Sequence, residues 1–171
     1  MKKNLLALNL ALFILFIYTS ATAQSIRWGI SGGSSDGTPG STDETVVDMT
    51  TDPAGNIYLL SSVYHSSLTI DGHPLSAFGS QDILLSSFKC DGTYRWSKLL
   101  GGSSADIPAV VKTDASGGVY IEGYMSTHFV TLHLDSDTSW TTGSSYKNLF
   151  IAKYDTAGNY KWLNMPQPDT T

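Results

Sequence analysis

The chain has 171 residues, of which 41% are hydrophobic and 15% charged, and it carries a formal net charge of −5. This length suits one compact domain, because domains commonly hold about 100 to 150 residues. An acidic chain without a run of Lys or Arg lacks the positive surface that nucleic acids and anionic membranes attract, so we expect neither as a partner. Cys90 is the single cysteine, which excludes an internal disulfide.

Residues 1–23 predict a secretory signal peptide. Two lysines, Lys2 and Lys3, precede an apolar stretch over 5–18, and small residues at Ala21 and Ala23 form a cleavage site. The alternative is an uncleaved anchor, which the length disfavours because a spanning helix needs about 20 apolar residues. We therefore expect an exported protein, periplasmic or extracellular, with no membrane span after cleavage.

An internal repeat organises the rest of the chain. Residues 82–96 align without a gap onto residues 148–162, at a spacing of 66 positions, and the glycines, tyrosines and tryptophans coincide. The repeat divides the sequence into an opening segment with a Trp strand, two full units and a tail, and we place these at 24–43, 44–102, 103–165 and 166–171.

Short segments rich in Val, Ile, Tyr and Phe, separated by turn-forming residues, predict strands and no helix after residue 23. The expected strands, in chain order, cover 25–30, 45–50, 56–64, 82–88, 93–99, 108–113, 119–124, 149–154 and 160–163, with shorter extended segments at 67–70 and 129–134. Turns beginning at Asp52, Asp114 and Asp155 each contain a Gly that accepts positive φ, which predicts tight hairpins.

Several of these strands are apolar on both faces, notably 57–60, 83–85 and 149–151. Such strands need cover on both sides, and four-stranded sheets stacked around an axis provide it. The sequence therefore predicts an all-β, β-propeller-like fold with two four-stranded blades and an N-terminal strand. Because propellers carry about four to eight blades, this is an incomplete propeller.

The pattern resembles the SBBP repeat of exported bacterial β-propellers over nearly the whole mature chain. The residues that carry the resemblance are Trp28, Gly32, Gly33, Asp52, Gly55, Asn56, Tyr58, Asp82, Trp96, Gly101, Gly102, Asp106, Asp114, Gly117, Tyr120 and Gly123. The resemblance implies blade packing and does not imply an activity. With two units, either the chain is the amino-terminal piece of a longer protein, or copies assemble so that several chains share a ring; both leave apolar blade faces that need cover.

Residues that carry chemistry are scattered along the sequence. The four histidines, His65, His73, His128 and His133, match no zinc spacing, and we expect them to be solvated loop residues. A segment that begins at Asp135 alternates oxygen ligands, yet Trp140 and Tyr146 hold the places where a calcium loop has its Gly and its Glu, so a polar turn is favoured over a weak calcium site.

Among the acids Asp36, Asp43, Glu44, Asp82 and Asp106, the last two recur at repeat positions, which favours capping of strand backbone over catalysis. We expect Cys90 to be a small, half-buried strand residue, with a reactive thiol or an intermolecular bridge as alternatives.

No nucleophile, phosphate-loop or zinc-protease motif is present in the sequence, so we expect no catalytic residue, no metal and no cofactor. Exposed aromatic rings are candidates for ligand binding, with loop packing as the alternative: Tyr64, Tyr124, Trp140 and Tyr146. We expect a binding or scaffolding module whose partner is a protein or a glycan and which self-assembles through exposed blade faces. The alternatives are a polysaccharide hydrolase or lyase with a channel site, and a fragment without activity of its own.

Overall fold

The computed structural model describes residues 28–34, 44–64, 67–126, 131–134, 138–141 and 147–166, and at positions 140, 141, 147 and 148 the backbone alone. All regular elements in these ranges are β-strands, which confirms the predicted all-β fold. No helix long and apolar enough to cross a membrane occurs within the described ranges. The predicted signal peptide lies outside them and stays a prediction.

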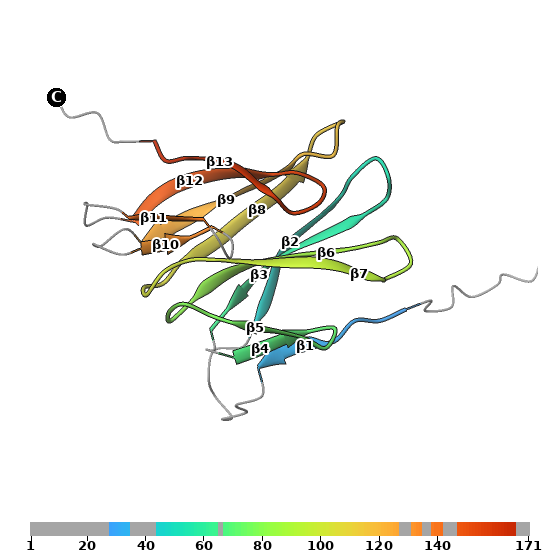
Figure 1. Cartoon of the computed structure of the whole chain (residues 1–171), viewed down its shortest axis with the longest axis horizontal. Helices are drawn as coiled ribbons and strands as arrows, with labels where there is room; N and C mark the ends of the chain where they lie inside the picture. The colour runs from blue at the N-terminus through green and yellow to red at the C-terminus, as the bar shows by residue number, and fades with distance from the viewer. Residues whose placement is uncertain are drawn as a thin grey trace, which may run out of the picture.

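Two antiparallel four-stranded sheets form the body of the molecule (Figure 1). Blade 1 consists of β2 (Thr45–Thr51), β3 (Ile57–Val63), β6 (Asp82–Phe88) and β7 (Tyr94–Leu100), paired in that order. Blade 2 consists of β8 (Ile107–Thr113), β9 (Val119–Ser126), β12 (Lys147–Tyr154) and β13 (Tyr160–Asn164), again paired in chain order. These are the two predicted four-stranded units.

Two small sheets accompany the blades. One contains β1 (Gly32–Ser34), β4 (Ser67–Ile70) and β5 (His73–Ser76), and the other is the hairpin of β10 (Thr131–His133) and β11 (Ser139–Thr141). The expectation of an opening strand over 25–30 is wrong for its described part, because residues 28–30 pair with no strand. The first strand begins at Gly32 instead and pairs with β4, where Gly32 lies opposite Ile70.

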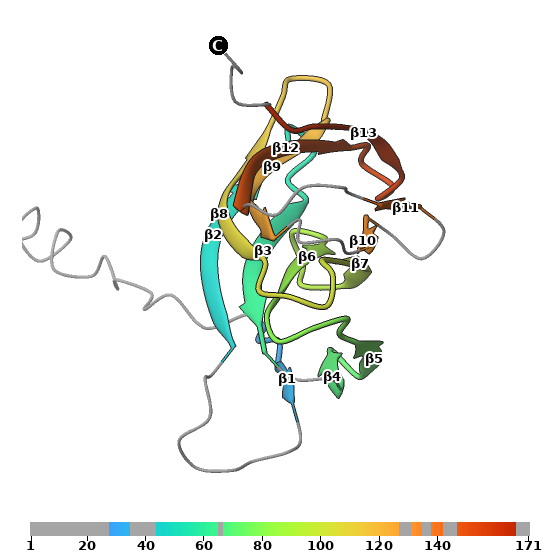
Figure 2. The same cartoon turned by 90° about the vertical axis from the view of Figure 1, so that its left-hand side faces the viewer.

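The blades stack face to face, and the main core lies between them. Blade 1 contributes Tyr58, Leu60, Ile83, Leu85 and Leu100, and blade 2 contributes Val111, Val119, Ile121, Met125, Phe150, Ala152 and Tyr154. The inner strands β2 and β8 contact each other directly, as Figure 2 shows. Asp48 on β2 ties them together, since its Oδ2 accepts hydrogen bonds from the Val111 backbone at 3.0 Å and from Lys112 Nζ at 2.8 Å.

The predicted Asp-led turns form as expected. In the turn from β12 to β13, Gly158 has φ of 82° and donates its N–H to Asp155 O at 3.0 Å. Asp155 Oδ1 accepts the backbone N–H of Ala157 and of Asn159, both at 2.9 Å. The turn from β6 to β7 closes in the same way although it begins with Lys89, because Gly92 has φ of 87° and donates to Lys89 O at 2.9 Å. Register is therefore fixed locally at both outer hairpins.

Candidate functional site

A tryptophan at the end of one repeat packs on the outer hairpin of the next. Trp96, on β7 of blade 1, donates its Nε1–H to Thr156 O at 3.0 Å and covers Gly158 in the outer hairpin of blade 2. Trp28 donates its Nε1–H to Cys90 O at 3.2 Å and covers Gly92 in the outer hairpin of blade 1. Trp28 therefore holds, relative to blade 1, the position that Trp96 holds relative to blade 2.

Arg95 strengthens the junction between the blades. Its Nη2 donates to Thr156 O at 2.6 Å, and its Nη1 donates to Tyr58 Oη at 3.2 Å and Ser87 Oγ at 2.8 Å. Tyr58 in turn donates to Asp52 Oδ2 at 2.9 Å. Burial acts to raise the pKa of Asp52, but hydrogen bonds from Asn56, Tyr58 and Ala54 outweigh it and hold that pKa below its usual value.

Blade 2 has an outer face that points away from blade 1. Strand register places Tyr124 opposite Leu149 and places Tyr120, Lys153 and Trp162 in one row across β9, β12 and β13. Tyr124 is 47% exposed, Leu149 43% and Trp162 42%. We call this surface the outer face of blade 2; its members are Tyr120, Glu122, Tyr124, Leu149, Ile151, Lys153 and Trp162.

The outer face of blade 2 corresponds, position by position, to a face of blade 1 that is buried. Tyr58 and Tyr120 each lie three positions after the glycine of an Asp-led turn, so they correspond to each other in the repeat. Ile83 corresponds to Leu149 at the spacing of 66. Tyr58 and Ile83 are fully buried in the core between the blades. The same side of the repeat is thus covered in blade 1 and open in blade 2.

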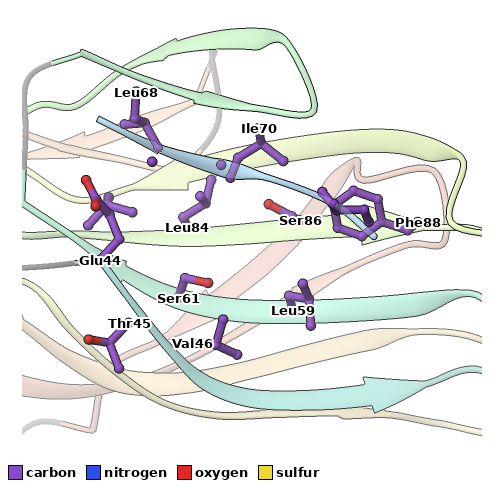
Figure 3. A pocket seen from close by; sticks show the side chains of 14 residues that line it. Glu44, Thr45, Val46, Leu59, Ser61, Leu68, Ile70, Leu84, Ser86 and Phe88 are labelled. Carbon is purple, nitrogen blue, oxygen red and sulfur yellow. The ribbon is translucent and has the colours of Figure 1, made fainter. Parts of the chain in front are cut away.

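Blade 1 has an open face of its own, partly roofed by the small sheet of β1, β4 and β5. A cavity of about 240 Å³ lies there, and Figure 3 shows it between β2, β3 and β6 on one side and β1 and β4 on the other. We call it the blade 1 groove; its apolar lining includes Val46, Leu59, Leu68, Ile70, Leu84 and Phe88. Glu44 is the single charged residue among those that line it. Met49, opposite Leu59 on the same face, is 60% exposed.

Two carboxylates, Asp82 and Asp106, are completely buried beside the junction. Their hydrogen-bond donors are backbone N–H groups, of Phe78 (2.7 Å) and Gly79 (3.1 Å) to Asp82 Oδ2, of Gly102 (2.8 Å) to Asp106 Oδ2 and of Ser126 (2.9 Å) to Asp106 Oδ1. The expected capping role is confirmed for both residues. Buried this way, neither carboxylate can reach a polymeric substrate.

The two carboxylates converge on Gly101. A Cβ at Gly101 would lie 2.0 Å from Asp82 Oδ1 and 2.8 Å from Asp106 Oδ2, so a side chain there is excluded. Asp82 Oδ1 is buried without a hydrogen-bond partner among the described residues. Burial, with the nearby charge of Asp82 as a smaller contribution, raises the pKa of Asp106 to about 6. Burial also raises the pKa of Asp82.

The histidines do not converge on a metal site in the described ranges, where no group of three or more metal-ligating side chains occurs. His73 stacks on Tyr94 with ring centroids 3.9 Å apart, and His133 stacks on Phe78 at 4.1 Å. Both residues lie on strands, β5 and β10, and not in loops as expected. His73 is exposed, in line with the expectation, whereas His133 is half-buried. His65 and His128 lie outside the described residues, as do Asp36, Asp43 and Asp135.

The four aromatic candidates are not brought together by the described part of the fold. Tyr64 follows β3 and is half-buried, whereas Tyr124 lies on the outer face of blade 2. Trp140 is on β11, with its side chain outside the described set, and Tyr146 lies outside it altogether. The sequence reasoning missed Trp162, although the repeat held a signal, because Trp162 aligns with Trp96 at the spacing of 66.

The half-buried strand position expected for Cys90 is wrong. The residue lies in the turn after β6 and is exposed. Its carbonyl oxygen, rather than its thiol, makes the contact that the structure records, as the acceptor of the Trp28 indole N–H.

No protein-family model matches the chain. An uncharacterized WD repeat-containing protein of Acanthamoeba polyphaga mimivirus is 32% identical over 76 residues, which is 43% of this chain. The chain spans only 6% of the length of that relative. WD repeats form four-stranded propeller blades, so this similarity and the two stacked sheets together fit a β-propeller-like repeat module.

Proposed function

We propose that this chain is an exported module of the SBBP type that binds other proteins through its open blade faces and has no catalytic role. The outer face of blade 2 carries the proposal. Three large apolar side chains, Tyr124, Leu149 and Trp162, are each more than two-fifths exposed on one face of the sheet. Contiguous apolar patches of this kind mark protein interaction sites.

Part of this face is held in a fixed geometry. Lys153 Nζ donates to Tyr120 Oη at 2.7 Å and to Asp114 Oδ2 at 3.3 Å, and it lies 4.7 Å from the centre of the Tyr120 ring. Trp162 packs edge-on against the same ring, with centroids 6.0 Å apart. A surface whose aromatic residues are already ordered loses less side-chain entropy on binding.

The composition of the face favours a protein over a glycan. Leu149 lies opposite Tyr124 and Ile151 opposite Glu122 on neighbouring strands, so two aliphatic side chains lie between the aromatic residues, beside one exposed carboxylate. A sugar needs hydrogen-bonding groups for its hydroxyls beside the stacking ring, whereas aliphatic and aromatic side chains of a protein partner need apolar contact. The alternative of a polysaccharide hydrolase or lyase draws no support from Asp82 and Asp106, since both are inaccessible.

A paired capture experiment tests the proposal. The full chain, a Leu149→Asp variant and a Thr69→Asp control are immobilised and exposed to the secreted proteins of the source organism. Both substitutions add a negative charge on an exposed strand position, but Thr69 lies on β4, away from blade 2. Proteins that the wild type and the control retain and that Leu149→Asp loses support the proposal. Equal retention by all three, or turnover of a polysaccharide by the purified chain, contradicts it.

A further inference from the structure

We infer that the outer face of blade 2 docks on the blade 1 groove of a second copy of this chain, and that Trp162 then takes the place of the second copy's Trp28. The inference rests on the proposed function and names the partner of the same face. The resulting contact is head-to-tail, because two different surfaces of the same chain meet.

The two surfaces are repeats of two surfaces that already fit together. Between the blades, the Ile83 side of blade 1 is covered by the Val111 and Phe150 side of blade 2. Leu149 repeats Ile83 on the open side of blade 2, while Met49 and Leu84 repeat Val111 and Phe150 on the open side of blade 1. One chain therefore carries a repeat of each half of its own internal interface. The half on blade 2 is exposed, and the half on blade 1 is exposed at Val46 and Met49 but covered by β4 at Leu84.

Trp162 gives this fit its anchor. Trp96 and Trp28 each place a ring over a hairpin glycine and donate an N–H to a carbonyl in that hairpin. Trp162 occupies the same place at the end of its own repeat, yet its indole nitrogen has no acceptor in the described part of the chain, and the side chain is 42% exposed. A hairpin like that of residues 89–93 would supply the missing carbonyl acceptor and glycine, and a second copy offers such a hairpin.

The blade 1 groove suits the aliphatic centre of the opposing face. Its open part is formed by Val46, which is 59% exposed, and by the half-buried Leu59, whereas Leu84 and Phe88 are already buried. Exposed apolar side chains such as Val46 gain free energy when an apolar partner covers them. In the internal junction the corresponding space is filled by Ile83, Leu85 and Leu60 of the preceding blade, whose counterparts on the outer face of blade 2 are Leu149, Ile151 and Glu122. Leu149 and Ile151 of a second copy would approach the groove from the same direction.

Trp28 acts as a competitor inside the chain. It covers the Gly92 hairpin that Trp162 of the second copy requires, but it remains 39% exposed, and residues 28–30 make no strand pairing that would hold them. Displacing one partly exposed ring costs less than displacing a paired strand. The chain thus limits its own association, and removal of Trp28 should strengthen it.

Charge sets the conditions for association. Each copy has a formal net charge of −5, so two copies repel one another at low ionic strength. Added salt screens that repulsion and leaves the apolar contact intact. Association should therefore become tighter as salt rises.

Sedimentation equilibrium on the full chain tests the inference. Trp162→Ala should raise the Kd for self-association at least about thirtyfold, as expected for a central interface tryptophan. Trp28→Ala should lower that Kd, and Phe78→Ala should leave it unchanged, since Phe78 has similar exposure but lies in the loop between β5 and β6. Equal association of Trp162→Ala and wild type would overturn the inference.

A cross-linking experiment tests the same geometry without removing Trp162. Lys161 corresponds to Arg95, whose guanidinium reaches the hairpin carbonyl of Thr156, and the matching carbonyl in blade 1 belongs to Cys90. In Lys161→Cys, a short bis-maleimide should join residue 161 of one copy to Cys90 of another, as peptide mapping would show. Thr69→Cys should give no such link.

These outcomes separate the inference from the proposed function. If Lys161→Cys shows no link to Cys90 of another copy and Trp162→Ala does not alter association, the partner is not a second copy. The proposed function would still stand if Leu149→Asp loses captured proteins that the wild type retains.

Discussion

Replacing Gly158 by alanine should destabilise the protein through the contact between the two blades. Gly158 has φ of 82°, a conformation that costs an L-residue about 1 to 2 kcal/mol. In addition, the new Cβ would lie 2.7 Å from Trp96 Cδ2 and 2.9 Å from Trp96 Cε2, closer than carbon atoms can approach. The Trp96 ring must therefore move away from the hairpin.

The magnitude follows from what that movement breaks. The Trp96 indole donates to Thr156 O at 3.0 Å, and a hydrogen bond of this kind contributes about 1 kcal/mol. Together with the backbone strain, the loss of this bond gives about 2 to 3 kcal/mol, before any loss of packing around the ring. Unfolding in urea, followed by tryptophan fluorescence, measures the change in the free energy of unfolding.

Gly72→Ala supplies the matched control. Gly72 has nearly the same φ, 78°, but a Cβ there would meet no atom within 4 Å. Only the cost of placing an L-residue at positive φ should remain, and it lowers the free energy of unfolding by about 1 to 2 kcal/mol. If the two variants lose the same stability, the Trp96 contact does not stabilise the junction, and the argument from the repeated tryptophan–hairpin contact is refuted.

The remaining predictions concern the blade faces and the buried acids. Val111→Ala should lower the free energy of unfolding by about 1 to 3 kcal/mol while its repeat partner Met49→Ala changes it by less than about 0.5 kcal/mol, because one is fully buried and the other 60% exposed; urea unfolding checks both. Carbon NMR should find the Asp106 carboxyl titrating near pH 6, and Asp82→Asn should lower that pKa by removing a nearby charge. Since the folded-state pKa is raised, the contribution of Asp106 to stability is complete below about pH 4 and is lost as pH rises through about 6. A titration near pH 4 would contradict the burial argument.

Local chemistry made much of the fold predictable from the sequence. The turn at Asp155 was readable because Asp and Gly satisfy the turn backbone by themselves, with no help from distant residues. The four-stranded units followed from the repeat and from strands apolar on both faces. The opening strand is predicted in the wrong place because the sequence around Trp28 has the composition of a strand. The position of Trp28 depends instead on its hydrogen bond to Cys90, in a hairpin 62 residues away.

The site was less predictable because it depends on pairing across strands. Tyr124 could be named as an exposed aromatic residue, but its position opposite Leu149 is a matter of register. The burial of Asp82 and Asp106 together beside Gly101 likewise needs three segments to meet. Sequence periodicity specifies which residues share one face of a strand, and it does not specify whether another sheet covers that face.

The β10–β11 hairpin packs between the two blades on the side away from β2 and β8. The inner strands β2 and β8 touch directly, while farther out Leu132 and Leu134 enter the core between the blades, and His133 exchanges backbone hydrogen bonds with Gly101 (Figure 2). The hairpin thus separates the outer parts of two sheets whose inner strands touch. The small sheet that contains β4 and β5 lies on the open side of blade 1 in the corresponding place. We expect the size of these inserts to affect the rotation from one blade to the next, and that rotation governs whether successive blades close into a ring or continue as an open spiral.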